Sequence, residues 1–192
     1  MPRPSLKSTR TDQILDALEI CLVRYGLEGA TQERIAEQAG LARALIRHNV
    51  GNRDEMLRLG LERFTRRSDE QLQALFDELP DNGRAQVLVD WLFDPRYFDA
   101  HAVRVLESFS NWAADRRDAS ALVVSWTERF IDALAEQLLL AFPNSKASDR
   151  DTVATSIAGL YFQLASLSAL GPTQSVQQRS AAAGRRLLAI LS

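Results

Sequence analysis

The sequence predicts an all-α protein with about nine helices. Only 9 Gly and 6 Pro occur in 192 residues, so residues that interrupt helices are few. Long stretches are rich in Ala, Leu, Arg, Glu and Gln, which favour helices. No segment shows the alternation of apolar and polar residues that is typical of half-buried strands.

The first helix is predicted to begin near Thr9, which forms an N-cap signature with Asp12, and to end at Gly26. Because Cys21 belongs to the apolar stripe of this helix, we expect its thiol in the core instead of at a reactive site. The stripe is formed by Ile14, Leu18, Cys21, Leu22 and Tyr25.

Two short helices follow and are separated by a glycine turn. Thr31 is the predicted N-cap of the first and Gly40 its end, while the second runs to about Val50. This arrangement predicts a helix-turn-helix motif at about residues 31–50. Asn52 and Glu55 form a further N-cap signature, so we expect a longer helix after them, ending near residue 78.

Five more helices are expected after this one, and the helix near 118–142 is apolar on several sides, as in the centre of a bundle. The sequence predicts a helix-turn-helix domain over 1–53 and a helical-bundle domain over 54–192. The five helices are predicted at about 84–93, 96–115, 118–142, 149–170 and 174–191, with breaks at Asp94-Pro95, Arg116-Arg117, Phe142-Pro143 and Gly171-Pro172.

The composition excludes several classes of chemistry. Cys21 is the only cysteine, and His48 and His101 are the only histidines, so intrachain disulfides, zinc fingers and two-histidine metal sites cannot form. The sequence also lacks a phosphate-binding glycine loop, a serine nucleophile elbow and a His-Glu-x-x-His motif. We therefore expect a protein that is not an enzyme, with no catalytic residue, cofactor or metal.

The charges are distributed unevenly. Residues 1–67 hold 12 basic and 9 acidic side chains, whereas the remainder holds 11 basic and 16 acidic ones. A basic end joined to an acidic body is typical of nucleic-acid-binding proteins. No apolar run approaches the roughly 18 residues of a membrane span, and the start of the chain lacks a signal-peptide core. We expect a cytoplasmic protein without a membrane partner.

The second helix of the predicted motif carries polar side chains suited to DNA. In a helix-turn-helix, this helix lies in the major groove. Arginine pairs with O6 and N7 of guanine, and asparagine reaches a base or a phosphate. A merely solvated polar face is the alternative. The polar residues are Arg43, Arg47, His48 and Asn49.

Residues 9–57 contain a series of short motifs in a fixed order. They are Ile14-Leu15-Asp16-Ala17-Leu18, Tyr25-Gly26, Ala30-Thr31, Ile35-Ala36-Glu37-Gln38-Ala39-Gly40-Leu41, Leu45-Ile46 and Gly51-Asn52-Arg53-Asp54-Glu55-Met56-Leu57. In order and spacing they resemble the DNA-binding domain of the tetracycline-repressor (TetR) family. The chain departs from the family at Arg47-His48-Asn49-Val50, where Tyr-Tyr-His-Phe or Tyr-Trp-His-Val is frequent.

The resemblance implies a role for each matching position. Thr31 and Gln32 would lie at the phosphate backbone, and Arg53 would replace a lysine that contacts it. The positions that would face bases are Arg43, Ala44 and Leu45, and those that would contact bases or phosphates are Arg47, His48 and Asn49.

The C-terminal part resembles the family in plan. The resemblance implies that residues 54–192 form a domain for ligand binding and dimerisation, and that its two final helices pair with their copies in a second subunit. Apolar residues on both helices repeat at alternating spacings of four and three, which suits a four-helix dimer interface. Burial inside the monomer's own bundle would give the same period. The predicted interface residues are Val153, Ile157, Leu160, Leu164 and Leu187.

Two fragments, Ile157-Ala158-Gly159-Leu160-Tyr161 and Phe109-Ser110-Asn111-Trp112-Ala113, resemble the choline-responsive BetI-like branch of the family. The C-terminal part also concentrates aromatic residues, among them Phe98, Phe130, Tyr161 and Phe162. A pocket of such residues suits an apolar or cationic small molecule, although a fully packed core is the alternative. The predicted walls are Trp91, Phe109, Trp112 and Trp126, with His101 as the polar contact.

These expectations combine into a ligand-responsive transcription regulator. A homodimer would bind a pseudo-palindromic DNA operator as a repressor, and a small-molecule effector would release it. One alternative is a helical carrier or enzyme for an apolar small molecule, with an N-terminal interaction module. Another is a helical dimer without a ligand.

Overall fold

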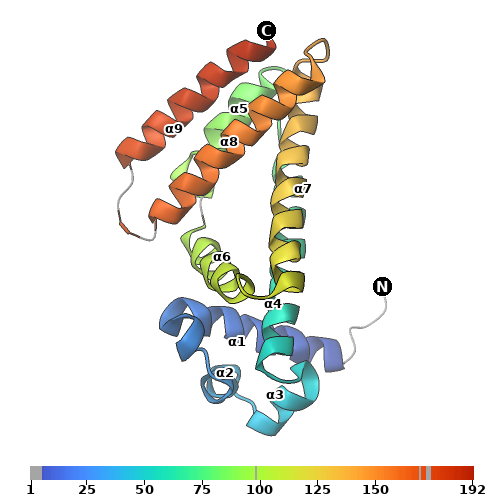
Figure 1. Cartoon of the computed structure of the whole chain (residues 1–192), viewed down its shortest axis with the longest axis vertical. Coiled ribbons are helices and arrows are strands. Elements are labelled where there is room, and N and C mark those ends of the chain that lie inside the picture. Colours follow the sequence, from blue (N-terminus) through green and yellow to red (C-terminus); the bar gives the residue numbers. More distant parts are fainter. Residues whose placement is uncertain (1–5, 98, 169, 172–173) are drawn as a thin grey trace. The chain divides into compact units, whose positions relative to one another are not determined.

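The computed structural model describes residues 6–97, 99–168, 170–171 and 174–192 of the chain (Figure 1). Phe98 and the predicted break at Pro172 lie outside them. One compact unit comprises residues up to 66 together with 104–123, and a second comprises 67–103 and 124–192. The units do not follow the predicted division after residue 53, because the start of the fourth helix and residues 104–123 belong with the first three helices.

Helix α1 (Leu6–Gly29) is longer than predicted. It already runs through Thr9, which is therefore not its N-cap. The predicted end at Gly26 coincides with a kink, where φ is 69° and ψ is −179°, a backbone conformation that favours glycine. Four of the five predicted stripe residues are buried, but Tyr25 is exposed and packs its ring against the guanidinium of Arg34.

Cys21 lies in the core of the first unit, as predicted. Its side chain is fully buried, and this burial raises the pKa of the thiol. The neutral thiol is a weak nucleophile, so Cys21 serves packing.

Helices α2 (Gln32–Ala39) and α3 (Arg43–Val50) form the predicted helix-turn-helix. The Thr31 Oγ1 accepts a hydrogen bond from the Arg34 backbone N–H at 3.3 Å and caps α2. Gly40, with φ of 64°, ends α2 in the left-handed conformation and allows the sharp turn. The two helices contribute the buried side chains of Ile35, Ala36, Ala39, Ile46 and Val50 to the core.

Helix α4 (Arg53–Asp77) begins with the predicted capping arrangement. The Asn52 backbone N–H donates to Glu55 Oε2 at 2.7 Å, and the Glu55 N–H donates to Asn52 Oδ1 at 2.9 Å. Further along α4, Gly60 allows a close approach of Phe109, since a Cβ at Gly60 would lie 2.9 Å from that ring. Phe109 belongs to α6 (Ala100–Ala113), whose later residues complete the first unit.

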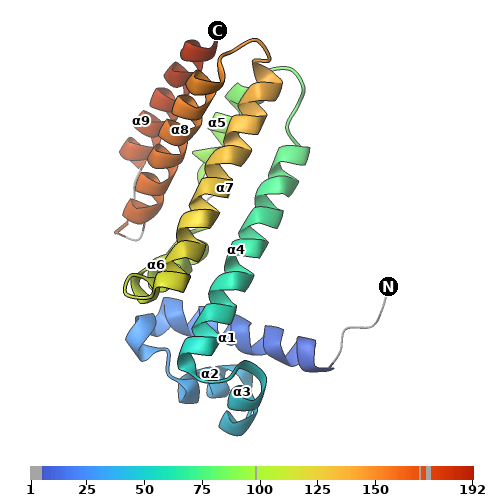
Figure 2. The ribbon, with the colours of Figure 1, turned by 45° about the vertical axis from the view of Figure 1, so that its right-hand side comes forward.

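The second unit is a helical bundle (Figure 2). Its core is formed by apolar side chains such as Leu88, Leu134, Leu138 and Val153. Gly184 allows the helix that contains it, α9 (Gln174–Leu187), to approach Val89 closely, because a Cβ at Gly184 would lie 3.0 Å from a Val89 methyl group. The end of α4 from residue 67 and the start of α6 up to residue 103 belong to this unit. Its other elements are α5 (Arg84–Leu92), a 3₁₀ turn (Pro95–Tyr97), most of α7 (Arg117–Ala141), α8 (Ala147–Ser168), α9 and a final 3₁₀ turn (Leu188–Leu191).

Helix α6 begins at Ala100, later than the predicted start at 96. The Asp99 Oδ1 accepts hydrogen bonds from the backbone N–H groups of His101 at 2.8 Å and Ala102 at 3.1 Å, and so caps the helix here. Within the described residues the chain contains nine α-helices and no strand, which confirms the all-α prediction. None of these helices is long and apolar enough to cross a membrane.

Candidate functional site

One face of α3 presents small and basic residues to solvent. Arg43, Ala44, Arg47 and His48 are exposed, and their spacing of i, i+1, i+4 and i+5 places them on a single helix face. Ile46 and Val50 are buried on the opposite face and fix α3 to the core of the unit. A rigid helix with an exposed basic face can enter the major groove of DNA.

Arg43 forms an ion pair with Glu33, although both side chains are largely exposed. The Arg43 Nη1 lies 2.5 Å from Glu33 Oε1, and the two side chains are 65% and 58% exposed. Since Glu33 lies in the first turn of α2, this contact joins the two helices of the motif at their surface.

Four other residues with predicted DNA contacts form hydrogen bonds within the chain. Thr31 caps α2, and Gln32 Nε2 donates to the Gly51 carbonyl at 3.2 Å. Asn49 Nδ2 donates to the Leu45 carbonyl at 2.7 Å. Arg53 Nη2 donates to the Leu27 carbonyl at 2.6 Å and ties the start of α4 to the end of α1. All four are half-buried, as is Leu45, so these residues also support the motif.

Trp112 is part of the frame that supports α4. Its indole N–H donates to Asp54 Oδ1 at 3.0 Å, and Arg116 Nη2 donates to the same oxygen at 3.3 Å. The Arg116 guanidinium also lies 5.1 Å from the centre of the Trp112 ring. This connection between residues 54 and 112 had no local signal in the sequence.

The predicted ligand-binding residues lie in different units. Phe109 and Trp112 are buried in the first unit, whereas Trp91, His101 and Trp126 belong to the second. His101 is exposed near the start of α6, and Trp91 is half-buried with its ring 5.4 Å from that of Tyr97. Of the predicted pocket walls, Trp126 alone joins the aromatic group described next.

Four aromatic side chains gather inside the second unit, three of them from the wider set noted in the sequence. Phe130 stacks on Tyr161 at 5.4 Å and lies 5.2 Å from Phe162, whose ring meets Trp126 edge-on at 5.8 Å. Burial raises the pKa of the Tyr161 phenol, and the negative charge of Asp99 raises it further. The group therefore combines aromatic faces and a neutral phenol under the influence of a carboxylate.

Three predicted interface residues are core residues of their own chain. Val153, Ile157 and Leu164 are at most 3% exposed and pack in the core of the second unit. The prediction is therefore corrected for these three, because the repeat that they share with Leu160 reflects burial within the monomer.

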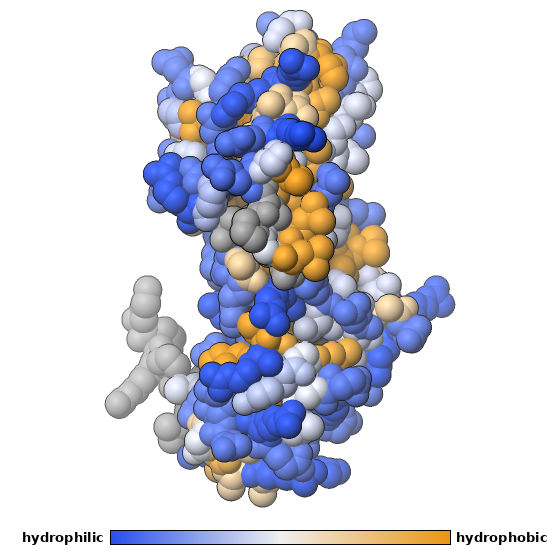
Figure 3. All heavy atoms as spheres, turned by 90° about the vertical axis from the view of Figure 1, so that its left-hand side faces the viewer, coloured by the Kyte–Doolittle hydropathy of each residue, from blue (hydrophilic) through white to orange (hydrophobic). Residues whose placement is uncertain are grey.

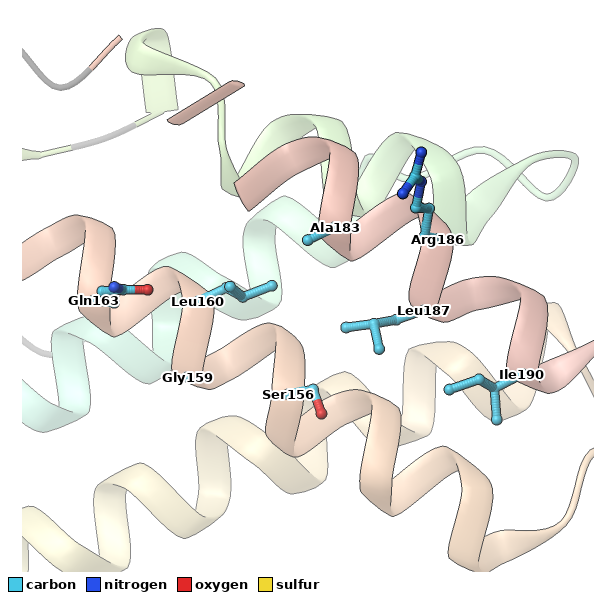
Figure 4. A pocket seen from close by; sticks show the side chains of 8 residues that line it. All are labelled: Ser156, Gly159, Leu160, Gln163, Ala183, Arg186, Leu187 and Ile190. Carbon is cyan, nitrogen blue, oxygen red and sulfur yellow. The ribbon is translucent and has the colours of Figure 1, made fainter. Parts of the chain in front are cut away.

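Leu160 and Leu187 instead line an open groove between α8 and α9 (Figure 4). Their side chains extend into the space between the two helices. Ile190, also at the groove, is 49% exposed, and Figure 3 shows apolar side chains among hydrophilic ones on the face that carries α9. The other lining residues are Ser156, Gly159, Gln163, Ala183 and Arg186.

Known proteins similar to the chain are transcriptional regulators. No protein-family model matches the chain. It is 27% identical over 169 residues to the HTH-type transcriptional regulator BetI of Stenotrophomonas maltophilia, which covers 85% of each chain. Its fold matches a TetR transcription regulator from Haloarcula marismortui with a TM-score of 0.79 and 16% identity, over 96% of this chain and 98% of that one.

A second similar structure is a candidate transcriptional regulator from Saccharomonospora viridis in complex with choline, with a TM-score of 0.77 and 16% identity over 94% of this chain and 96% of that one. With the helix-turn-helix and its exposed basic face, these similarities define a helix-turn-helix transcriptional regulator. The chain has the fold of TetR transcription regulators, and its sequence resembles the BetI regulators, which agrees with the resemblance seen in residues 9–57.

Proposed function

We propose that the chain is a repressor that binds a pseudo-palindromic operator as a homodimer and is released by a small-molecule effector. The observation that carries the proposal is the exposed face of α3, on which Arg43, Arg47 and His48 stand free of the core. In a two-fold dimer, two such helices enter successive major grooves about one helical turn apart.

The residues of the motif divide between reading bases and holding the backbone. Arg43 would pair with a guanine, and the methyl group of Ala44 would contact a thymine methyl. Arg47 and His48 contact bases or phosphates one helical turn later. Thr31 and Gln32 at the start of α2 lie where backbone N–H groups attract a phosphate. Asn49, Leu45 and Arg53 act at the edge of this surface and hold the motif in place.

DNA binding is tested directly with purified protein. We expect retardation of mixed-sequence duplex DNA at low salt, and selection from a random pool should then yield a pseudo-palindrome. Lys146→Ala serves as a control. It removes one exposed positive charge from the second unit and should retard DNA as the wild type does. Absence of retardation at low salt would contradict the proposal and favour a helical carrier.

The groove between α8 and α9 is the proposed dimer interface. Leu160, Leu187 and Ile190 offer apolar area, and Gly159 and Ala183 permit close approach of a partner helix. Because a homodimer pairs the same surface on both subunits, two copies of this groove would form a four-helix interface. The interface is thus shifted by part of a helical turn from the buried residues of the predicted seam.

The aromatic group around Phe130 is the proposed effector site. Faces of Trp126, Phe130, Tyr161 and Phe162 suit an apolar or cationic molecule, and the nearby charge of Asp99 favours a cation. Choline is a suitable first probe, since the Saccharomonospora viridis structure contains it. Tryptophan fluorescence should respond to choline and less to its neutral analogue 3,3-dimethylbutanol. An equal response to both would exclude recognition of the charge.

A further inference from the structure

The Arg43–Glu33 ion pair lies in the middle of the proposed DNA surface. Arg43 is the first residue of α3, and Glu33 follows Gln32 at the start of α2. Their 2.5 Å contact is exposed on both sides, so the pair remains open to competition from other ions. The residue that would read a base is thus held by a carboxylate of the same chain.

A carboxylate at this position opposes DNA binding. The N-terminus of α2 is proposed to face phosphates, and Glu33 would bring a negative charge toward them. An acidic residue in the first turn of a helix does stabilise the helix. Glu37, one turn further along α2, is exposed as well, but the described residues show no ion pair to it. Glu33 is therefore distinguished by its contact with Arg43.

We propose that Glu33 is a specificity-determining residue that withholds Arg43 from phosphates and leaves it available to a guanine. This inference rests on the proposed function. On mixed DNA, Arg43 could leave the Glu33 carboxylate only for a phosphate, which is another anion. The phosphate would also repel Glu33. Arg43 therefore stays paired with Glu33 and displaces no counterion from a phosphate.

The correct operator provides a stronger competitor. An exposed ion pair changes an equilibrium constant by less than about fivefold. A bidentate arginine–guanine contact discriminates between bases by roughly 5- to 150-fold. Arg43 can therefore leave Glu33 when O6 and N7 of a guanine lie within hydrogen-bonding distance. At other DNA sequences no contact as strong as this one replaces the ion pair.

Glu33→Gln tests the proposal on mixed-sequence duplex DNA. Gln keeps the size of the side chain and removes its charge, so Arg43 becomes free to bind a phosphate. We expect the slope of log affinity against log salt to steepen by about 0.9. The advantage of the variant over wild type should grow roughly 3.5-fold for each fourfold reduction in salt. On the selected operator, affinity should change by less than about fivefold.

Two control variants separate this effect from a general change of charge. Glu37→Gln removes the same charge from the same face of α2 and should leave the slope unchanged. In an Arg43→Ala background, Glu33→Gln should change the slope by much less than about 0.9, because there is no arginine to release and only the repulsion between Glu33 and phosphates is removed. Circular dichroism confirms that each variant is folded.

The inference and the proposed function fail in different ways. If the wild type does not retard DNA, the proposed function is wrong. If the wild type binds DNA but Glu33→Gln behaves like Glu37→Gln, or Glu33→Gln steepens the slope by the full value of about 0.9 without Arg43, only the inference is overturned. A loss of operator affinity in Glu33→Gln would also overturn it, since Glu33 would then position Arg43 for binding.

Discussion

Removing Arg47 or Arg43 from α3 should affect DNA binding in different ways. Arg47 is exposed and has no ion pair among the described residues, so it is free to neutralise a phosphate. Arg47→Ala should therefore weaken binding to operator and mixed DNA alike and reduce the salt slope by about 0.9. Fluorescence anisotropy at several salt concentrations measures both. A loss confined to the operator would instead make Arg47 a base-reading residue.

Arg43→Ala should show the opposite pattern. If Arg43 reads a guanine, the substitution costs about 1–3 kcal/mol on the selected operator. On mixed DNA the loss should be small, because Arg43 is paired with Glu33. Operators with each base pair exchanged in turn show where the variant has lost its preference. Equal losses on both kinds of DNA would place Arg43 at a phosphate.

Arg53 has a structural role that the sequence could not reveal. Its guanidinium donates to the Leu27 carbonyl, which lies 26 residues away along the chain. Arg53→Ala should therefore lower the free energy of unfolding by about 1.5–3 kcal/mol, the value of a hydrogen bond from a charged group. Urea denaturation measures the change. Arg58→Ala, which removes only an exposed ion pair with Glu62, should cost less than about 0.5 kcal/mol.

At the scale of elements, local signals predicted the motif well. The caps at Thr31 and at Asn52 with Glu55 depend on residues three apart, and the structure contains both. The same kind of signal at Thr9 was wrong, because helical geometry begins upstream of it. Gln32, Asn49 and Arg53 were found as motif positions, but contacts such as that of Arg53 with Leu27 join distant segments and leave no pattern in the sequence.

The period of α8 also shows a limit of sequence patterns. A repeat of four and three residues marks apolar positions, but it does not say whether they face their own bundle or a partner. Packing inside the second unit buries Val153, Ile157 and Leu164, and this leaves the side with Ser156, Gly159 and Gln163 for the groove. The choice between these sides is made by tertiary contacts.

Gly159→Leu is a sharp test of the groove. A Cβ at Gly159 meets no atom within 4 Å, so the monomer can accept a side chain there. The helix should gain up to about 1 kcal/mol, since glycine is unfavourable in a helix interior. A partner packed against Gly159 would be displaced, and light scattering should show a folded monomer. Thr155→Leu, at an exposed position outside the groove lining, should remain dimeric. A dimeric Gly159→Leu would place the interface elsewhere.

Asp99 connects two parts of the second unit, since it caps α6 and its charge acts on Tyr161 in the proposed effector site. Burial raises the pKa of Tyr161, and this charge raises it further. Asn can accept the same capping hydrogen bonds without the charge. In Asp99→Asn the Tyr161 pKa should fall, because a negative charge no longer disfavours the phenolate. Ultraviolet titration of the tyrosines detects this fall in pKa, and the titration of Tyr161→Phe identifies the signal of Tyr161. Choline binding should weaken while 3,3-dimethylbutanol binding stays unchanged, and an unchanged choline affinity would contradict the proposed site.

If the protein is a repressor released by an effector, the effector and the DNA must lower each other's binding affinity by the same factor. An effector that lowers operator affinity by a given factor binds more weakly to the DNA-loaded dimer by the same factor. Choline titrated against tryptophan fluorescence, with and without saturating operator, measures one side of this relation. Operator titrated with and without choline measures the other. We expect equal factors of roughly 5- to 150-fold. If choline binds equally well in both conditions, it occupies the protein without acting as its inducer.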